Sequence, residues 1–239
     1  MSDDLTVLAR PTRRQIPGAV APTWHTVVML LVIALLSGLS AYSHGPSPAG
    51  ISHGAVFRYL AVMITEWVVL GFAWLGIRLR DLRIRDLIGG DWPKWTALAR
   101  DLGLAVVFLI LSNILLAGVA HLFHADSREV ARRLLPHGRT ETVVYLLLCG
   151  TAGFCEEVLF RGYLQKQLTA WTRNATAGLL LQALAFGAGH GYQGPKLMAV
   201  ITVYGCLFGL LAQRRRSLRP GMIAHFMQDS LVGLASRLR

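Results

Sequence analysis

Seven apolar segments dominate the chain and restrict what it can fold into. The first four are about as long as a helix that crosses the ~30 Å hydrocarbon core of a bilayer. The segments cover residues 24–41, 59–77, 102–122, 142–160, 177–190 (the short one), 197–213 and 221–235. We therefore expect an all-α, multi-pass transmembrane helical bundle of about seven spans. An eighth, re-entrant segment stays open.

The composition also indicates a membrane protein. Of the 239 residues, 54% are hydrophobic and 15% are charged, whereas soluble domains carry roughly 25% charged residues. The first apolar segment begins at residue 24 and is full length. It lacks the pattern of a cleaved signal sequence, so we expect a retained span.

The excess of basic residues follows the positive-inside pattern. The 24 Lys and Arg outnumber the 13 Asp and Glu, for a net charge of +11. With the N-terminus inside and seven spans, 16 of these 24 residues lie on the cytoplasmic side. Such a bias sets orientation and brings basic loops to anionic lipids, so we expect membrane lipids and not nucleic acid as partners. Arg outnumbers Lys 21 to 3, which favours the cytoplasmic (inner) membrane of a bacterium.

Ionisable residues within the apolar segments are the candidates for a functional site. A carboxylate in the bilayer is costly unless it faces a cavity or a partner. Four clusters qualify: Glu156, Glu157 and Arg161 in the fourth segment, His190 at the end of the fifth, His225 and Asp229 in the seventh, and Glu66 alone in the second.

Two of these clusters have a spacing of four, which places both side chains on one face of a helix. Glu157 can therefore pair with Arg161, and Glu156 is left free. Asp229 can hydrogen-bond one ring nitrogen of His225 and leave the other for a substrate or an ion.

The expected turns bring the clusters to one depth. If the fourth and fifth segments form a hairpin near Arg173, Glu156 and His190 are each about 25 Å from the turn. A second hairpin near residues 216–220 places His225 on the order of 10 Å from the cytoplasmic face, at a depth similar to that of Glu156. We expect these groups to line a water-filled cavity that opens to the cytoplasm.

These residues also form three motifs in order: EExxxR (Glu156, Glu157, Arg161), FxxxH (Phe186, His190) and Hxxx(N/D) (His225, Asp229). In this the chain resembles the CPBP (Abi) family of intramembrane proteases, which is related to the type II CAAX prenyl endopeptidases. The resemblance covers residues 142–235. We therefore divide the chain into a cytoplasmic tail (1–23), N-terminal transmembrane helices (24–141) and a CPBP-like catalytic core (142–239).

The resemblance implies a role for each motif residue. Glu156 activates a water together with His190, and His225 and Asp229 stabilise the oxyanion. Glu157 and Arg161 have supporting roles. The prenyl endopeptidases carry asparagine at the position of Asp229, and an ionised aspartate cannot donate a hydrogen bond. We therefore expect Asp229 to orient His225, which remains the donor.

The catalytic type has two readings. Metal-free catalysis by a glutamate is favoured, with no cofactor and no metal site, because HExxH is absent and the histidines lie on different segments. The alternative is a Zn²⁺ ion held by Glu156, His190 and His225.

The expected function is that of an intramembrane endopeptidase that hydrolyses a peptide bond of a peptide or protein substrate near the cytoplasmic face. The alternative is a non-catalytic membrane protein of the same fold, such as a bacteriocin self-immunity or transport accessory factor. Glu66 has no assigned role, since it has no close partner in its own segment.

Overall fold

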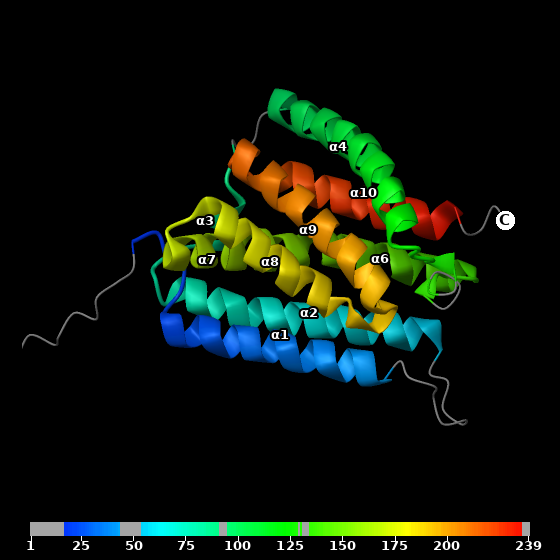
Figure 1. Cartoon of the computed structure of the whole chain (residues 1–239), viewed down its shortest axis with the longest axis horizontal. Coiled ribbons are helices and arrows are strands. Elements are labelled where there is room, and N and C mark those ends of the chain that lie inside the picture. The colour runs from blue at the N-terminus through cyan, green and yellow to red at the C-terminus, as the bar shows by residue number, and fades with distance from the viewer. Residues whose placement is uncertain (1–16, 44–53, 91–94, 129, 131–133, 236–239) are drawn as a thin grey trace, which may run out of the picture.

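The computed structural model describes residues 17–43, 54–90, 95–128, 130 and 134–235, and its regular elements there are helices (Figure 1). They begin with α1 (Thr23–Ser43), α2 (Ala55–Arg78), α3 (Ile84–Ile88) and α4 (Trp95–Leu122). A continuous stretch follows, made of α6 (Arg139–Glu156), the π-helix η1 (Glu157–Leu164) and α7 (Gln165–Thr172). The last elements are α8 (Ala175–Gly189), the 3-10 turn η2 (Gly191–Gln193), α9 (Pro195–Arg215) and α10 (Arg219–Ala235).

All seven expected segments fall on helices, so the all-α, multi-pass class is confirmed. Five stretches are long and apolar enough to cross a membrane: Thr23–Tyr42, Ala55–Arg78, Trp95–Leu122, Arg139–Thr172 and Pro195–Arg215. Two helices are shorter, with 15 residues in α8 and 17 in α10. That α8 and α10 also cross the membrane stays a prediction. The same holds for an eighth, re-entrant segment and for the domain boundaries. Residues 1–16 of the expected tail lie outside the described residues.

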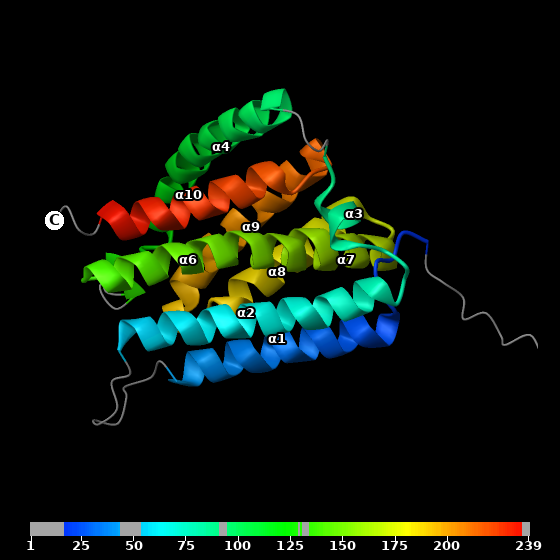
Figure 2. The same ribbon diagram turned by 180° about the vertical axis from the view of Figure 1, so that it is seen from behind.

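The helices are arranged in layers across the bundle. α1 and α2 form one side and α4 the opposite side, with the α6–α7 stretch, α8, α9 and α10 between them (Figures 1 and 2). α6 packs against α2 and α10, while α8 packs against α7 and α9. The segments that carry the three motifs therefore lie in the interior layers. Many large apolar side chains of the outer helices are exposed, including Leu31, Ile64 and Ile114, and in a membrane they would contact lipid.

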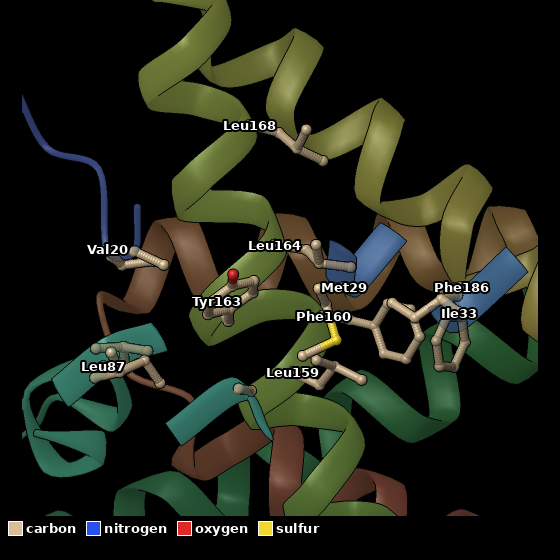
Figure 3. Packing of buried hydrophobic residues seen from close by; sticks show 13 residues of the cluster. Val20, Met29, Ile33, Leu87, Leu159, Phe160, Tyr163, Leu164, Leu168 and Phe186 are labelled. Atoms are coloured by element: carbon tan, nitrogen blue, oxygen red, sulfur yellow. The ribbon is translucent and has the colours of Figure 1, made fainter. Parts of the chain in front are cut away.

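The largest apolar core joins the N-terminal helices to the motif-bearing stretch. Its buried residues come from α1, α2, α3, η1, α7 and α8 (Figure 3). A polar contact lies inside this core, because the hydroxyl of Tyr163 is 2.8 Å from Nδ1 of His25 and 2.9 Å from Oγ1 of Thr26. Buried polar groups need such partners, so this contact fixes η1 against α1.

The turn between α7 and α8 is where the sequence predicted a hairpin. Arg173 has the left-handed conformation, with φ of 53°, which is common directly after a helix. Asn174 then caps α8, since its side-chain oxygen accepts hydrogen bonds from the backbone N–H of Thr176 at 2.9 Å and of Ala177 at 3.0 Å. The second expected hairpin is also present, and its turn residue Arg216 has φ of 50°.

Candidate active site

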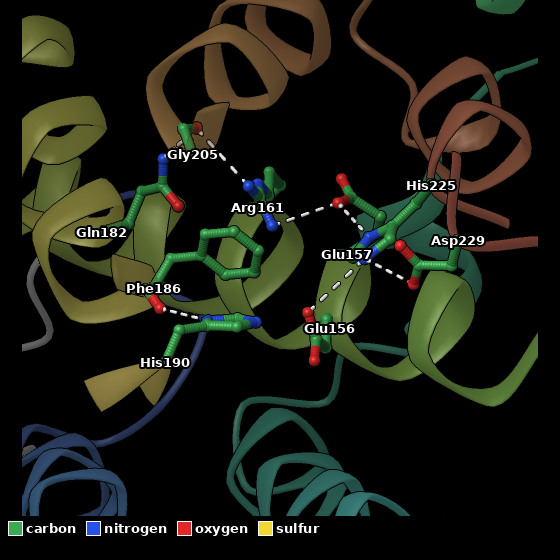
Figure 4. A network of polar contacts seen from close by, with 9 residues as sticks. All are labelled: Glu156, Glu157, Arg161, Gln182, Phe186, His190, Gly205, His225 and Asp229. Carbon is green, nitrogen blue, oxygen red and sulfur yellow. Dashed lines mark hydrogen bonds and ion pairs between the residues drawn. The ribbon is translucent and has the colours of Figure 1, made fainter. Parts of the chain in front are cut away.

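Three elements bring the motif residues together (Figure 4). Glu156 is the last residue of α6, His190 follows the last residue of α8, and His225 and Asp229 lie in α10. α10 packs against α6, and α8 packs against η1. The convergence that the sequence predicted is therefore present for the helices that carry these residues.

The site lies where α-helical hydrogen bonding changes to that of a π-helix. α6 ends at Glu156, and η1 begins at Glu157. Short π-helical turns occur frequently at functional sites. In a regular α-helix, adjacent side chains point about 100° apart, and for this reason the sequence predicted that Glu156 and Glu157 face different surroundings. In the structure both carboxylates reach the same imidazole, that of His225.

Glu157 and Arg161 form the predicted ion pair. Oε1 of Glu157 lies 3.0 Å from Nη1 of Arg161, and both side chains have no exposed surface. The guanidinium carbon also lies 4.2 Å from the ring centroid of Phe186 and 4.9 Å from that of Phe208. A charge pair so deeply buried is stable only when both members are present. The pair therefore holds two opposite charges together in the interior, next to His225.

His225 is the centre of the cluster. Its Nδ1 lies 3.2 Å from Oε1 of Glu157 and forms a hydrogen bond with it. Its Nε2 lies 3.6 Å from Oε2 of Glu156 and 3.6 Å from Oδ2 of Asp229. One ring nitrogen thus faces the buried ion pair, and the other faces two carboxylates.

The group that fixes the ring differs from the one that the spacing predicted. Asp229 was expected to hydrogen-bond His225, but its carboxylate stands 3.6 Å from Nε2, beyond an ordinary hydrogen bond. Glu157 makes that bond instead, at Nδ1. Gly221 permits the approach of α10, because a β-carbon there would lie 3.0 Å from Oε2 of Glu157.

His190 lies beside the cluster without joining it. Its Nδ1 lies 2.9 Å from the carbonyl oxygen of Phe186, one turn earlier in the chain. A carbonyl only accepts, so Nδ1 carries the proton and Nε2 is left as an acceptor. The ring points toward Glu156 (Figure 4). Within the part of the chain that the structure describes, no hydrogen bond or ion pair connects His190 to Glu156, His225 or Asp229.

The comparison with known families identifies this region. Residues 138–231 match a family model described as type II CAAX prenyl endopeptidase Rce1-like. This segment is therefore similar to the type II CAAX prenyl endopeptidases. The resemblance that the motifs indicated is confirmed, and the match implies the fold of a CAAX-type intramembrane protease. No match was found among curated proteins or among solved structures.

The Rce1-like segment, residues 138–231, contains the whole His225 cluster and His190. The side chains of this cluster differ in their solvent exposure. The side chains of Glu156 and Asp229 are 19% and 37% exposed, whereas that of Glu157 is 0% exposed. The side chains of Glu156 and Asp229 are therefore partly exposed and that of Glu157 is not, although Oε2 of Glu156, the oxygen nearest His225, is buried.

Glu66 lies next to the site, although it precedes the Rce1-like segment. It is placed on α2, which packs against α6, and its charge interacts with those of Glu156, His225 and Asp229. Its Oε2 is buried and has no hydrogen-bond partner among the described residues. The sequence signalled Glu66 only as a carboxylate within an apolar segment, because the packing of α2 against α6 cannot be read from either segment alone.

The Rce1-like segment does not present a zinc site as arranged here. Such a site would need Glu156, His190 and His225 to point at a common centre. Among the described residues, no group of three or more His, Cys, Asp and Glu side chains has an arrangement that could hold a metal ion. The residues do not fit this ion, and no step proposed below passes through a metal.

Proposed function

We propose that the protein is an intramembrane endopeptidase that hydrolyses a peptide bond near the cytoplasmic face of the membrane. The observation that carries this proposal is the environment of Nε2 of His225, which is 3.6 Å from Oε2 of the partly exposed Glu156 while Nδ1 is held by Glu157. Hydrolysis by water needs a base and a hydrogen-bond donor at one place. The cluster offers both within the Rce1-like segment.

In this reaction Glu156 acts as the general base. Its carboxylate takes a proton from water, and the water oxygen attacks the carbonyl carbon of the substrate peptide. The bond between that carbon and the nitrogen then breaks, and the proton passes from Glu156 to the leaving amine. The products are a new carboxylate and a new amine, so that one water is consumed per bond.

His225 supplies the donor for the oxyanion. Nδ1 donates to Glu157, which keeps the ring in one orientation. The neighbouring carboxylates stabilise a positive charge on the ring, and Nε2–H can then donate to the developing oxyanion. A positioned donor of this kind is typically worth about 3–4 kcal/mol. Asp229 supports the charge of the ring, and Arg161 holds Glu157.

His190 helps to activate the attacking water. Its Nδ1 is bonded to the carbonyl oxygen of Phe186, so Nε2 is the atom available to accept a proton from water. The ring points toward Glu156 (Figure 4), which places a second acceptor near the base. This assigns His190 to activation of water and not to the oxyanion.

The proposed setting is the cytoplasmic membrane of a bacterium, with the N-terminus inside. The substrate is a peptide or protein that reaches the cytoplasmic end of the bundle. The family description names a CAAX prenyl endopeptidase, but a prenylated substrate is not carried over to this chain, because bacteria generally lack that modification.

Quantitative proteomics of membrane peptides tests the proposal. Cells expressing the Glu156→Gln variant should lose a defined set of cleavage products, while cells expressing Glu141→Gln should keep them. Glu141 is the matched control because it lies at the exposed start of the same helix, where its carboxylate bonds the backbone N–H of His137 at 2.8 Å. Glutamine can preserve such a cap. If both variants leave the peptides unchanged while an immunity or transport phenotype persists, the protein is the non-catalytic alternative.

A further inference from the structure

A second polar region lies at the end of the bundle that carries the Arg173 and Arg216 turns. There an open cavity of about 550 Å³ is lined by the segment before α1, by α3, α7, α8 and α9, and by the turn between α9 and α10. Arg161 lines this cavity, but its guanidinium is committed to Glu157. The cavity is therefore distinct from the His225 cluster.

The lining of this cavity is strongly basic. Lys166, Arg173 and Arg216 line it besides Arg161, and none of its lining residues is acidic. Nζ of Lys166 donates to the backbone oxygen of Leu87 at 3.0 Å, which fixes the ammonium at the wall. Asp86 on α3 interacts with that ammonium, and its carboxylate also caps α3 by accepting from the backbone N–H of Arg83 at 2.8 Å.

Two of the three lining arginines, Arg173 and Arg216, differ from nearby arginines in their ion pairing. Arg215 and Arg219 are ion-paired to the buried Asp101 of α4, at 3.6 Å and 3.1 Å. Within the described residues, the side chains of Arg173 and Arg216 have no such acidic partner. Both occupy left-handed turn positions, with φ of 53° and 50°, where glycine is the residue usually found.

Gln165 forms part of the cavity wall, although it is only 3% exposed. Its Nε2 donates to the backbone oxygen of Gly209 at 3.0 Å, which fixes the amide against α9. Its Oε1 is buried and has no hydrogen-bond partner among the described residues. The ligand contacts of the cavity therefore come from its basic side chains.

We propose that this cavity binds a phosphate ester. The phosphate would be held by Lys166, Arg173 and Arg216. The volume exceeds what a phosphate ion alone would fill, and Leu87, Ala170 and Leu218 supply apolar surface for an organic part. Basic pockets at the ends of transmembrane helices bind lipid headgroups by the same chemistry. The ester can come from an anionic lipid or from a soluble metabolite.

Binding to the full-length protein in detergent tests this site. The probes are phosphatidylglycerol, phosphatidylcholine, glycerol 3-phosphate and inorganic phosphate, and the readout is the dissociation constant from native mass spectrometry. We expect phosphatidylglycerol to bind about tenfold or more tightly than phosphatidylcholine. Competition by glycerol 3-phosphate would identify a soluble ester as the ligand, and its failure to compete would identify the lipid. Equal binding of both lipids, together with no binding of glycerol 3-phosphate, would overturn the proposal.

Variants test whether the ligand binds in this cavity. They also distinguish the loss of the cavity's charge from a general effect on folding. The double variant Arg173→Gln/Arg216→Gln should weaken binding of phosphatidylglycerol by roughly tenfold or more, whereas Arg85→Gln/Arg214→Gln should change it less than about twofold. The control removes the same charge from two exposed residues that do not line the cavity.

A cation at the end of a helix also stabilises that helix, so the unfolding midpoint of each variant is measured alongside binding. Ala170→Leu, which fills the cavity without changing charge, should weaken binding by itself and covers the case in which the double variant does not fold. An equal loss in the control double variant, or normal binding in Ala170→Leu, would contradict the site. Because the readout is binding, the result is independent of whether the protein is a protease.

Discussion

The Nδ1 atom of His225 lies 3.2 Å from Oε1 of Glu157, and the same oxygen lies 3.0 Å from the guanidinium of Arg161. One carboxylate oxygen thus contacts both the imidazole of the site and the buried cation that anchors it. The second glutamate of the EExxxR motif is therefore connected to the chemistry through a structural pair. This relationship leads to the first prediction.

The Glu157–Arg161 pair should be needed for stability as a unit. Glu157→Gln leaves the Arg161 guanidinium buried without a countercharge, so we expect the free energy of unfolding to fall by about 3–5 kcal/mol. The double variant Glu157→Leu/Arg161→Met removes both charges and should recover most of that loss. Equilibrium unfolding in detergent measures both values.

The same double variant distinguishes the role of Glu157 in holding His225 from its role in stability. It removes the carboxylate that holds Nδ1 of His225, so proteolysis should remain low even where stability recovers. Full activity in the stable double variant would show that the bond between Glu157 and His225 has no role in the reaction.

His225 and Asp229 should differ in their effect on cleavage. His225→Ala removes the proposed oxyanion donor and should lower the rate constant by about 10²–10³-fold. Asp229→Asn should keep substantial activity, because the hydrogen bond that orients the ring comes from Glu157. The measurement is the single-turnover rate for a substrate found by proteomics. An equal and complete loss in both variants would mean that Asp229 has an essential role of its own.

Glu66 should show opposite effects on stability and activity. Its Oε2 is buried without a hydrogen-bond partner among the described residues, so Glu66→Leu removes an unsatisfied polar group and should raise the free energy of unfolding by about 1–3 kcal/mol. If Glu66 serves the site, cleavage should fall in this stable variant, which is the usual trade-off at functional positions. Glu66→Gln, which keeps the shape, is the matched comparison. A variant that is more stable and fully active would assign Glu66 to packing alone.

Removal of divalent metal should leave the reaction intact. The protein purified without added metal should contain less than one zinc per chain by elemental analysis, and a chelator should change its cleavage rate by less than about twofold. This follows from a mechanism in which Glu156 activates water without a Lewis acid. Stoichiometric zinc, with activity lost to the chelator and restored by Zn²⁺, would establish the metal-dependent alternative.

Local patterns in the sequence were sufficient to predict the positions of the helices, the turns and the motif residues. Hydropathy and residue spacing report on one segment at a time, and they located the helices that carry Glu156, His190 and His225, together with the turn at Arg173.

The arrangement around the imidazole depended on contacts between helices. The spacing within one helix predicted that Asp229 lies beside His225, and its carboxylate is 3.6 Å from Nε2. The hydrogen bond to the ring comes from Glu157, which approaches from another element. The π-helix that begins at Glu157 alters the phase of that element, and no α-helical spacing rule anticipates it.

The sequence by itself thus determined that the chain forms a helical membrane bundle with ionisable residues at defined places along its spans. Only the tertiary structure decided which carboxylate bonds His225, that Glu66 lies near Glu156, and that Arg173 and Arg216 share a cavity with Lys166. The physical reason is that hydropathy and periodicity are properties of a single segment. The rotation of one helix against the next is fixed by side-chain packing between segments that are distant in the chain.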